Sequence, residues 1–304
     1  MYDVVIIGSG PAGLAAAIYA GRAKLNTLVI EEKPLSGGQI INTYEVDNYP
    51  GMPGISGFDL GQRMREHADK MEVTFKMLQV KGMEDNGPIK LVITEEEKIE
   101  TRTIIIASGA EHRKLEVPGE EELGGMGVSY CATCDGAFFK NRRVAVVGGG
   151  DVALEDALFL ARGCEKVYLI HRRDAFRGAK ILQEQVMANE RIEIIYDTVL
   201  TEIKGQDMVE EIALYNKKKD VSDILKVNGV FIAVGISPNN EAVMAELALD
   251  EQGYIKAGED CVTNKTGIFA AGDVRTKQLR QVITAASDGA NAITSVERYL
   301  LENA

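Results

Sequence analysis

Gly8-Ser9-Gly10-Pro11-Ala12-Gly13 follows the apolar run Val4-Val5-Ile6-Ile7 and opens an alanine-rich stretch from Leu14 to Ala23. This is GxGxxG between a predicted strand and a predicted helix, the context in which the pattern indicates a dinucleotide-binding unit. The glycines allow a tight turn and a close backbone approach to a pyrophosphate, whose charge the helix N-terminus stabilises. We therefore predict an α/β fold that begins with a Rossmann-like unit.

A second predicted strand and an acid complete this first unit. The strand runs from Thr27 to Ile30 and is followed directly by Glu31. A carboxylate at this place in a Rossmann unit accepts a hydrogen bond from a ribose hydroxyl. The alternative interpretation is a purely structural turn. It is the weaker one, because the glycine loop occurs together with both strands, the helix and the acid.

A second glycine loop follows the apolar run from Arg143 to Val147 and reads Gly148-Gly149-Gly150-Asp151-Val152-Ala153. After the next predicted strand, Lys166 to Ile170, there is no acid but the basic run His171-Arg172-Arg173-Asp174-Ala175-Phe176-Arg177. Guanidinium groups attract a 2′-phosphate by charge and by forked hydrogen bonds. The second unit is therefore predicted to bind NADP(H) rather than NAD(H); the alternative is a solvated basic patch.

A CxxC pair lies between the two loops, in Cys131-Ala132-Thr133-Cys134-Asp135. The chain has four cysteines and three histidines, and no second CxxC or nearby histidine completes the spacing of a zinc site, so we expect no bound metal. The N-terminus does not resemble a signal peptide, so we expect a cytoplasmic protein, in which a CxxC pair is typical of redox chemistry. A structural disulfide and a pair of inert thiols are the alternatives. Cys164 and Cys261 are interpreted as buried apolar residues.

The composition is that of an ordinary soluble chain with room for two domains. Its 304 residues are 45% apolar and 26% charged. The net charge of −12 disfavours nucleic acid or an anionic membrane as the main partner. No apolar run approaches the roughly 20 residues that span a bilayer.

The order of the apolar segments predicts nesting of the two units. Strand-like segments lie at 103–109, 229–235 and 267–271, and a helical pattern runs from Gln281 to Leu300. Such a closing strand and helix are typical of the flavin domain in proteins with two dinucleotide units. We expect one domain at 1–112 with 241–304, and a second, inserted domain at 113–240. The segments 111–113 and 236–240 would connect them.

The sequence resembles the low-molecular-weight, bacterial-type thioredoxin reductases, class II pyridine nucleotide-disulfide oxidoreductases, over nearly its whole length. The resemblance rests on motifs in matching order: Gly8 to Gly13, Gly37-Gly38-Gln39, Asn48-Tyr49-Pro50-Gly51, Cys131 to Gly136, Gly148 to Ala153, His171 to Arg177, Gly272-Asp273-Val274-Arg275 and Arg280-Gln281-Val282. It implies a homodimer with two Rossmann-like three-layer domains, the NADPH domain inserted into the FAD domain. It also implies a flavoprotein disulfide reductase that passes electrons from NADPH through FAD and the Cys131/Cys134 pair to the disulfide of thioredoxin.

The resemblance assigns cofactor contacts to matching positions. FAD is expected at Gly8, Ser9, Gly10, Pro11, Ala12, Gly13, Glu31, Gly38, Gln39, Asn48, Gly272, Asp273, Arg280, Gln281 and Val282, with Val80 as a weaker match near the adenine. NADPH is expected at Gly150, Asp151, Val152, Ala153, His171, Arg172, Arg173 and Arg177. Further cofactor contacts are expected at Ala107, Gly109, Gly148 and Ile236. Val152 stands where the family often has a hydroxyl residue, which is expected to weaken NADPH binding without abolishing it.

The resemblance also implies catalytic roles around the CxxC pair. Cys134 would lie next to the flavin, Cys131 would attack thioredoxin, and Asp135 would protonate a departing thiolate. The reverse assignment of the cysteines stays open, as does the interpretation of Asp135 as a helix N-cap or first-turn acid. Phe138 and Phe139 are either a docking patch or core residues. A dithiol oxidase of the same fold is the rival enzyme, which the basic run disfavours, and a flavin-binding redox sensor is the alternative outside enzymes.

Overall fold

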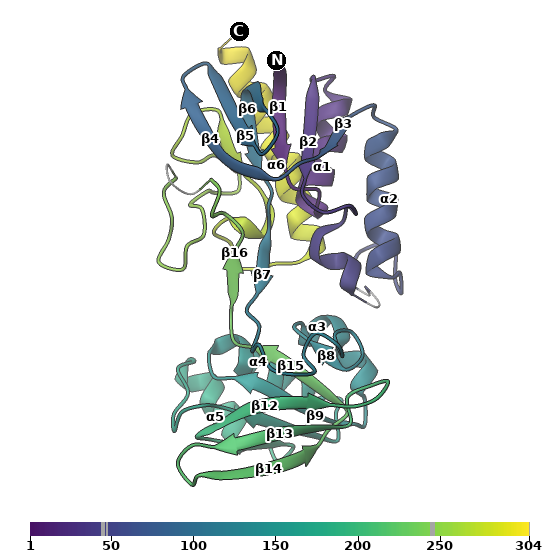
Figure 1. Ribbon diagram of the computed structural model, residues 1–304, viewed down its shortest axis with the longest axis vertical. Coiled ribbons are helices and arrows are strands. Elements are labelled where there is room, and N and C mark those ends of the chain that lie inside the picture. The colour runs from purple at the N-terminus through teal and green to yellow at the C-terminus, as the bar shows by residue number, and fades with distance from the viewer. Residues whose placement is uncertain (44–45, 47, 244–246, 304) are drawn as a thin grey trace. The chain divides into compact units, whose positions relative to one another are not determined.

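The computed structural model describes residues 1–43, 46, 48–243 and 247–303. The chain divides into two compact units, whose elements are labelled in Figure 1. Unit 1 comprises Met1–Glu111 and Ser237–Ala304, and unit 2 comprises His112–Ile236. The sequence predicts domain boundaries after residues 112 and 240. In the structure the first segment of unit 1 ends at Glu111, and unit 2 ends at Ile236. No helix among the described residues is long and apolar enough to cross a membrane.

Unit 1 is built on one sheet with the strand order β3-β2-β1-β6-β5-β4, with β17 also beside β6. The strands are β1 (Tyr2–Ile7), β2 (Thr27–Glu31), β3 (Thr74–Met77), β4 (Val80–Asn86), β5 (Ile89–Thr94), β6 (Lys98–Ile106) and β17 (Ile268–Ala270). Strand β6 pairs antiparallel with β5 along its first half and parallel with β17 along its second half. Because β2 and β6 flank β1 on opposite sides, the loop after β1 lies at a topological switch point.

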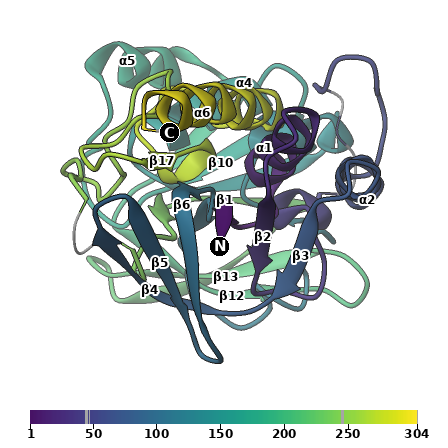
Figure 2. The ribbon, with the colours of Figure 1, turned by 90° about the horizontal axis from the view of Figure 1, so that it is seen from above.

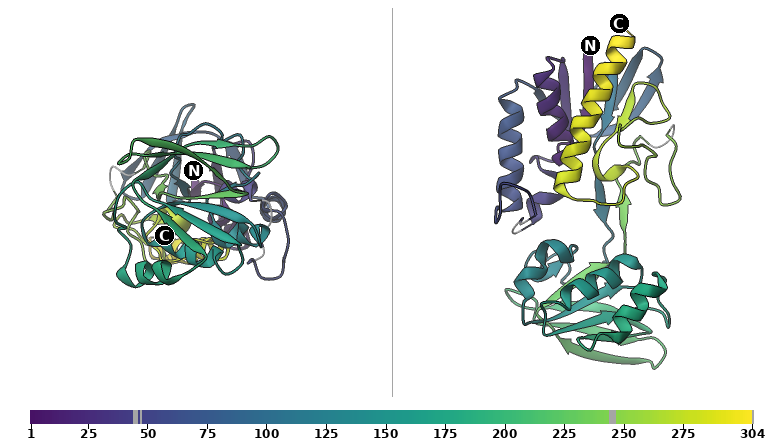
Figure 3. Two further views of the ribbon diagram at one scale, coloured as in Figure 1. Left: turned by 90° about the horizontal axis from the view of Figure 1, so that it is seen from below. Right: turned by 180° about the vertical axis from the view of Figure 1, so that it is seen from behind.

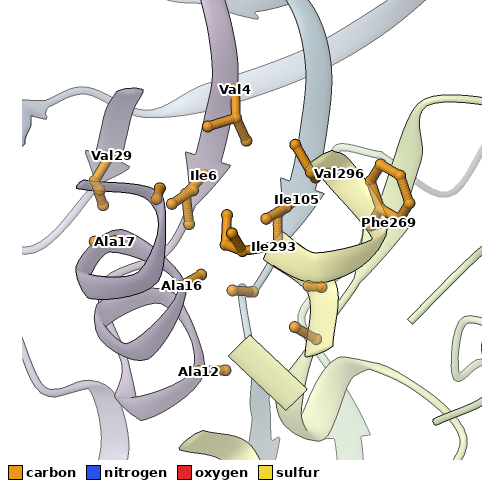
Figure 4. Packing of buried hydrophobic residues seen from close by; sticks show 14 of the residues in the cluster. Val4, Ile6, Ala12, Ala16, Ala17, Val29, Ile105, Phe269, Ile293 and Val296 are labelled. Carbon is orange, nitrogen blue, oxygen red and sulfur yellow. The ribbon is translucent and has the colours of Figure 1, made fainter. Parts of the chain in front are cut away.

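Two helices, α1 (Pro11–Arg22) and α6 (Val282–Glu302), lie side by side on one face of the parallel strands (Figures 2 and 3). Their axes approach closely because α1 presents alanines and α6 presents Gly289, where a Cβ would stand 2.2 Å from the Ala12 carbonyl oxygen. Figure 4 shows apolar side chains of both helices meeting those of the strands: Val4, Ile6, Ala12, Ala16, Ala17, Val29, Ile105, Phe269, Ile293 and Val296. Each fully buried Val, Ile or Phe side chain in this list contributes about 1.5–3 kcal/mol. This packing fixes the start of α1 against the sheet.

The other face of the unit 1 sheet is also covered. Alternate residues of β1 point to opposite faces, so Val4 and Ile6 join the helical side whereas Val5 and Ile7 join a second core. That second core includes Leu247 and Ile255 from the C-terminal segment. Among the described residues, unit 1 also contains α2 (Gly57–Asp69) and the 3₁₀ turns η1 (Gly38–Asn42) and η4 (Gly272–Val274).

Unit 2 repeats the plan with a parallel sheet in the order β11-β10-β9-β15-β8. Its strands are β8 (Val128–Ser129), β9 (Arg143–Gly148), β10 (Lys166–Ile170), β11 (Ile192–Ile195) and β15 (Gly229–Ala233). An antiparallel sheet of β12 (Thr198–Lys204), β13 (Glu211–Asn216) and β14 (Val221–Lys226) covers one face. The other face carries α3 (Ala132–Asp135), η2 (Gly136–Phe139), α4 (Asp151–Leu160) and α5 (Lys180–Ala188).

The two crossings of the chain between the units pair with each other as a two-stranded sheet of β7 (Ala110–His112) and β16 (Ile236–Pro238). Unit 2 is therefore inserted into unit 1. The expected fold class, α/β with two Rossmann-like three-layer domains of which one is nested in the other, is confirmed.

Candidate active site

A disulfide bond joins Cys131 and Cys134 in unit 2, with their Cα atoms 5.3 Å apart. Cys131 precedes the single turn of α3, and its carbonyl oxygen accepts hydrogen bonds from the backbone N–H groups of Cys134 and Asp135 at 3.3 and 3.1 Å. Both cysteines are half-buried. The turn thus holds the two sulfur atoms in bonding position while leaving them partly exposed.

The Asp135 carboxyl group is tied to the same turn through Ser129. The Ser129 hydroxyl donates to Asp135 Oδ2 at 2.5 Å and accepts from the Cys131 backbone N–H at 3.1 Å. Among the described residues, the buried Asp135 Oδ1 has no hydrogen-bond partner. Burial raises the pKa of Asp135, although the Ser129 hydrogen bond opposes this. The side chain makes no capping hydrogen bond to the 3₁₀ turn that follows, and Asp135 lies in the first turn of α3.

Ser129 is a site residue that the sequence reasoning missed. Its signal is only a serine two residues before the first cysteine, which is too common to single out. Its hydroxyl is hydrogen-bonded both to the Cys131 N–H and to the Asp135 carboxyl group, and Ser129 therefore connects the two residues.

The two phenylalanines after the CxxC pair have different environments. Phe139 is buried and meets the Phe231 ring edge-on at 5.2 Å between centroids. It also fills the space above Gly229, where a Cβ would lie 2.3 Å from the ring. Phe138 is 40% exposed. Phe139 is therefore a core residue, and Phe138 is the one that presents a surface.

The first glycine loop and the acid after β2 are bonded to each other in unit 1. The Ser9 backbone N–H and hydroxyl both donate to Glu31 Oε2, at 2.8 and 2.7 Å, and the Lys33 N–H donates to Oε1 at 3.0 Å. A carboxylate accepts about four hydrogen bonds, so Oε1 keeps capacity for a ribose hydroxyl. The loop and Glu31 form one cluster at the carboxyl ends of β1 and β2.

A third segment, Gly37 to Gln39, lies against this cluster. The Gly37 N–H donates to the Ser9 carbonyl at 2.8 Å, and a Cβ on Gly38 would lie 3.1 Å from the Gly10 Cα. Gly8 has φ +102°, and a Cβ there would lie 2.5 Å from the Ala107 carbonyl oxygen. Glycine is therefore required at Gly8 and Gly38, because the neighbouring backbone lies too close for a side chain. Pro11 is the first residue of α1, and the N-terminus of this helix lies at the first glycine loop.

The C-terminal segment brings its predicted residues to the same unit. Asp273 follows β17 in η4, and within the described part of the chain its buried Oδ1 has no hydrogen-bond partner. Burial raises the pKa of Asp273. A buried carboxyl oxygen without a partner costs free energy unless a ligand hydroxyl supplies one, so this position fits the polyhydroxyl part of a dinucleotide. Gln281 reaches across to Asn48, whose amide donates to Gln281 Oε1 at 3.0 Å.

The backbone N–H groups of Gln281 and Val282 lie at the start of α6. The Gln281 N–H donates to the Thr284 hydroxyl at 3.2 Å, so the helix itself uses one of them. The Val282 N–H belongs to the first turn, whose donors have no partner within the helix. Arg280 places its guanidinium 4.0 Å above the Tyr254 ring.

The other predicted residues lie at element boundaries. Val80 opens β4, two residues after Leu78, whose N–H donates to the Glu31 carbonyl at 3.0 Å. Gly109 follows β6 with φ +73°, and nothing lies within 4 Å of a Cβ built there. Ile236 opens β16.

The second glycine loop lies between β9 and α4 in unit 2. Asp151 is the first residue of α4 and its Oδ1 accepts a hydrogen bond from the Ala179 N–H at 2.6 Å. Val152 is 60% exposed, and no atom lies within 4 Å of a Cβ built on Gly150. The start of α4 is therefore sterically open at Gly150, and one Asp151 carboxyl oxygen is bonded to the neighbouring loop.

The basic run after β10 separates into exposed and buried side chains. Arg172, Arg173 and Arg177 are exposed, and in the part of the chain that the structure describes their guanidinium groups make no hydrogen bond or ion pair. His171 is 5% exposed. The three arginines supply the donors and the charge that a 2′-phosphate needs.

Cys164 and Cys261 are free and buried. Burial raises the pKa of the Cys164 thiol to about 11 and that of Cys261 to about 12. Both therefore remain protonated at neutral pH and inert, and their interpretation as apolar packing residues is confirmed.

Comparison with known proteins places the chain in a family. Residues 2–289 match the family described as pyridine nucleotide-disulphide oxidoreductase. The chain is 46% identical to thioredoxin reductase of Listeria innocua serovar 6a over 303 residues, 99% of this chain and 95% of that protein. It is also 46% identical to thioredoxin reductase of Mycolicibacterium smegmatis over 304 residues, 99% and 97% of the two chains.

A solved structure shows the same likeness in three dimensions. The crystal structure of thioredoxin reductase from Streptococcus pyogenes MGAS5005 has a TM-score of 0.94 at 44% identity, and the match covers 99% of each chain. The chain therefore belongs to the pyridine nucleotide-disulphide oxidoreductase family, among its bacterial-type thioredoxin reductases.

Proposed function

We propose that the protein is an enzyme that reduces the disulfide of thioredoxin with electrons from NADPH, using FAD and its own Cys131–Cys134 pair. One observation carries this proposal: the disulfide lies in the same compact unit as a glycine loop flanked by three exposed guanidinium groups. A dithiol stores two electrons, and the arginines suit NADP(H) as their source. When bound, FAD would supply the two-electron redox chemistry that connects NADPH to the disulfide.

The residues of unit 1 fit FAD. The N-terminus of α1 and the loop from Gly8 to Gly13 would hold the pyrophosphate, and Glu31 the adenosine ribose. Asp273 supplies the unpartnered buried carboxyl for a ribityl hydroxyl. The first turn of α6, at Val282, offers a backbone donor for negative charge at the flavin end.

The residues of unit 2 fit NADPH. The pyrophosphate would lie at the open start of α4, on residues 150–153, and the 2′-phosphate on Arg172, Arg173 and Arg177. The absence of a hydroxyl at Val152 removes one hydrogen bond to the pyrophosphate. The helix start and the three arginines remain to bind the nucleotide.

The dithiol then acts on the acceptor by thiol–disulfide exchange. The Cys131 thiolate attacks one sulfur of the thioredoxin disulfide and forms a mixed disulfide, while the departing thioredoxin thiolate takes a proton from Asp135. Cys134 attacks Cys131 in the mixed disulfide and releases the second thiolate of thioredoxin. The Cys131–Cys134 disulfide is restored, and thioredoxin has gained two electrons.

Thioredoxin reduction is expected to slow as the pH rises through the raised pKa of Asp135, because the deprotonated carboxylate cannot donate a proton. Asp135→Asn should lower the rate by about 10²–10⁴-fold and flatten this alkaline limb. Since the folded protein holds this proton more tightly, the contribution of Asp135 to stability is present at low pH and is lost as the pH rises through its folded pKa. Stopped-flow rates across a pH series test this. An alkaline limb that persists in Asp135→Asn would rule out the role.

Phe138→Ala is expected to raise the KM for thioredoxin several-fold with a smaller change in the free energy of unfolding than Phe139→Ala, because Phe138 is 40% exposed. Phe139→Ala, its matched control, should instead lower the free energy of unfolding by about 3–5 kcal/mol, because its buried ring leaves a cavity. Steady-state kinetics and urea titration of both variants separate the two effects. A KM in Phe138→Ala equal to that of the wild type would remove it from the docking surface.

Anaerobic titration of the yellow protein with NADPH, followed by oxidised thioredoxin, tests the whole proposal. The flavin absorbance should bleach with NADPH and recover on addition of thioredoxin. NADH at the same concentration should bleach it more slowly. A protein that is bleached by small dithiols and recovers only with oxygen would be a dithiol oxidase, and one that never recovers would fit a redox sensor.

We also propose a homodimer in the cytoplasm. The likeness to the thioredoxin reductases over nearly the whole chain supports this assembly and location. Sedimentation equilibrium at micromolar protein concentration tests the dimer, and a mass equal to one chain would contradict it. Fractionation of the source cells tests the location.

A further inference from the structure

His171 differs from the arginines of the basic run because its ring points inward. Its side chain is 5% exposed, and both ring nitrogens contact backbone carbonyls. Nδ1 lies 3.0 Å from the Gly148 oxygen, and Nε2 lies 3.0 Å from the Ala175 oxygen. Neither nitrogen is left to face a phosphate.

The two carbonyls belong to the two loops that the nucleotide must contact. Gly148 ends β9 and starts the loop at the pyrophosphate position, whereas Ala175 lies in the middle of the basic run. The ring also lies flat on Gly149, where a Cβ would stand 2.2 Å from its Cε1 and Nδ1 atoms. The imidazole therefore fills the space between the loops and bridges them.

Other contacts strengthen the same junction. The Arg177 N–H donates to the Gly149 carbonyl at 2.8 Å, and the Ala179 N–H donates to Asp151 Oδ1 at 2.6 Å. The buried Phe176 ring lies 5.3 Å from the His171 ring, between centroids. The backbone of the basic run is thus fixed to the glycine loop, while its arginine side chains remain exposed.

We propose that His171 is a positioning residue that fixes the distance between the pyrophosphate loop and the 2′-phosphate loop, and that it does not bind the 2′-phosphate. This inference rests on the proposed NADPH site. The family resemblance gave His171 as a residue that contacts NADPH. In this proposal the arginines bind the 2′-phosphate and His171 does not. A neutral imidazole has one N–H and hydrogen-bonds one of the two carbonyls, whereas an imidazolium has two N–H groups and hydrogen-bonds both.

The two roles predict different nucleotide specificities. A residue that shapes the pyrophosphate loop affects NADPH and NADH alike, because both carry a pyrophosphate. A ligand of the 2′-phosphate affects NADPH alone. We expect His171→Ala to lower kcat/KM for NADH as well as for NADPH, by at least several-fold for each, whereas Arg173→Ala lowers it for NADPH only, by about 10- to 100-fold.

Conservative variants test the two bridges separately. Asparagine places its amide near the position of Nδ1 and glutamine near that of Nε2. His171→Asn or His171→Gln should restore part of kcat/KM for both nucleotides, mainly through KM. A His171→Ala enzyme that loses NADPH but keeps its NADH value would overturn the inference.

Trypsin cleavage of the holoenzyme gives a readout that needs no nucleotide. Arg172, Arg173 and Arg177 are exposed cleavage sites on a loop that the bridge holds down. Cleavage there, followed by mass spectrometry, should be at least several-fold faster in His171→Ala than in wild type, and Arg173→Ala should not accelerate cleavage at the remaining sites. Equal rates in His171→Ala and wild type would contradict the bridge. Failure of the wild type to bind NADP⁺ in titration would instead count against the proposed function, and the cleavage test would still stand.

Discussion

A Cys134→Ser variant is expected to lose NADPH-dependent thioredoxin reduction by about 10³-fold or more. A serine hydroxyl forms no disulfide with Cys131, so the pair can no longer accept and release two electrons. Bleaching of the flavin by NADPH should persist, because the glycine loops of both units are untouched. The measurement is the steady-state rate with oxidised thioredoxin beside an anaerobic absorbance titration.

The two single variants also decide which cysteine attacks. If Cys131 is the attacking thiol, Cys134→Ser should accumulate a mixed disulfide with thioredoxin on non-reducing gels, whereas Cys131→Ser should not. The reverse pattern would reverse the assignment. Cys164→Ala is the matched control, because this thiol is buried and inert, and its turnover should stay within about twofold of wild type. Full activity in Cys131→Ser would refute a role for this cysteine.

Asp288→Ala is expected to lower the free energy of unfolding by about 3–5 kcal/mol. Asp288 is 4% exposed and accepts hydrogen bonds from Arg275 Nη2 at 2.6 Å and Lys277 Nζ at 2.9 Å, with the Gly272 N–H at 2.8 Å. Both cations have nearly buried side chains, so removing the carboxylate leaves two charges without the carboxylate that they are hydrogen-bonded to. Urea unfolding measures the loss. Asp69→Ala, which breaks the exposed pair with Arg65, should cost less than about 1 kcal/mol.

The same cluster predicts a pH dependence of stability. Burial would raise the pKa of Asp288, but hydrogen bonds from Arg275 and Lys277 outweigh it and hold this pKa below its ordinary value. A lowered folded pKa means that the stabilisation is present above the unfolded pKa of an aspartate and is lost as the pH falls through the folded one. Wild type should therefore lose stability on acidification more steeply than Asp288→Asn. Parallel acid-unfolding curves for the two proteins would contradict the assignment.

The glycine loops were predictable because their requirements are local. A turn that approaches a pyrophosphate needs glycine at fixed spacing after a strand, and GxGxxG and GxGxxA state this directly. The buried parallel strands β1, β2, β9 and β10 are continuous apolar runs, which is typical of strands covered on both faces. The positions of these strands in the sequence also predict where the two glycine loops lie and that unit 2 is inserted into unit 1.

The antiparallel parts could not be predicted in the same way. In β14 nearly every residue is exposed, so its sequence shows no alternation, and its pairing with β13 comes from tertiary structure. In β5, Lys90 is 1% exposed and is paired with Asp85, so a charged residue occupies a core position that a sequence pattern would assign to the surface. Pairing of this kind follows from contacts between distant residues rather than from local periodicity.

Side-chain direction was the other limit within the site. His171 stands in a basic run, and only the structure shows that its ring turns toward Gly148. Ser129 carries no motif at all, and its place between Cys131 and Asp135 is visible only in space. The sequence identifies the loops that form the candidate site, and the structure shows which contacts each residue within them makes.

The insertion of unit 2 has a consequence for synthesis on the ribosome. Helix α1 needs α6 beside it, because Gly289 of α6 packs against Ala12 directly behind the first glycine loop. Residues 237–304 leave the ribosome after all of unit 2, so the inserted unit can fold while its host is still incomplete. The glycine loop that is translated first therefore receives its supporting helix only after the whole of unit 2 has been translated.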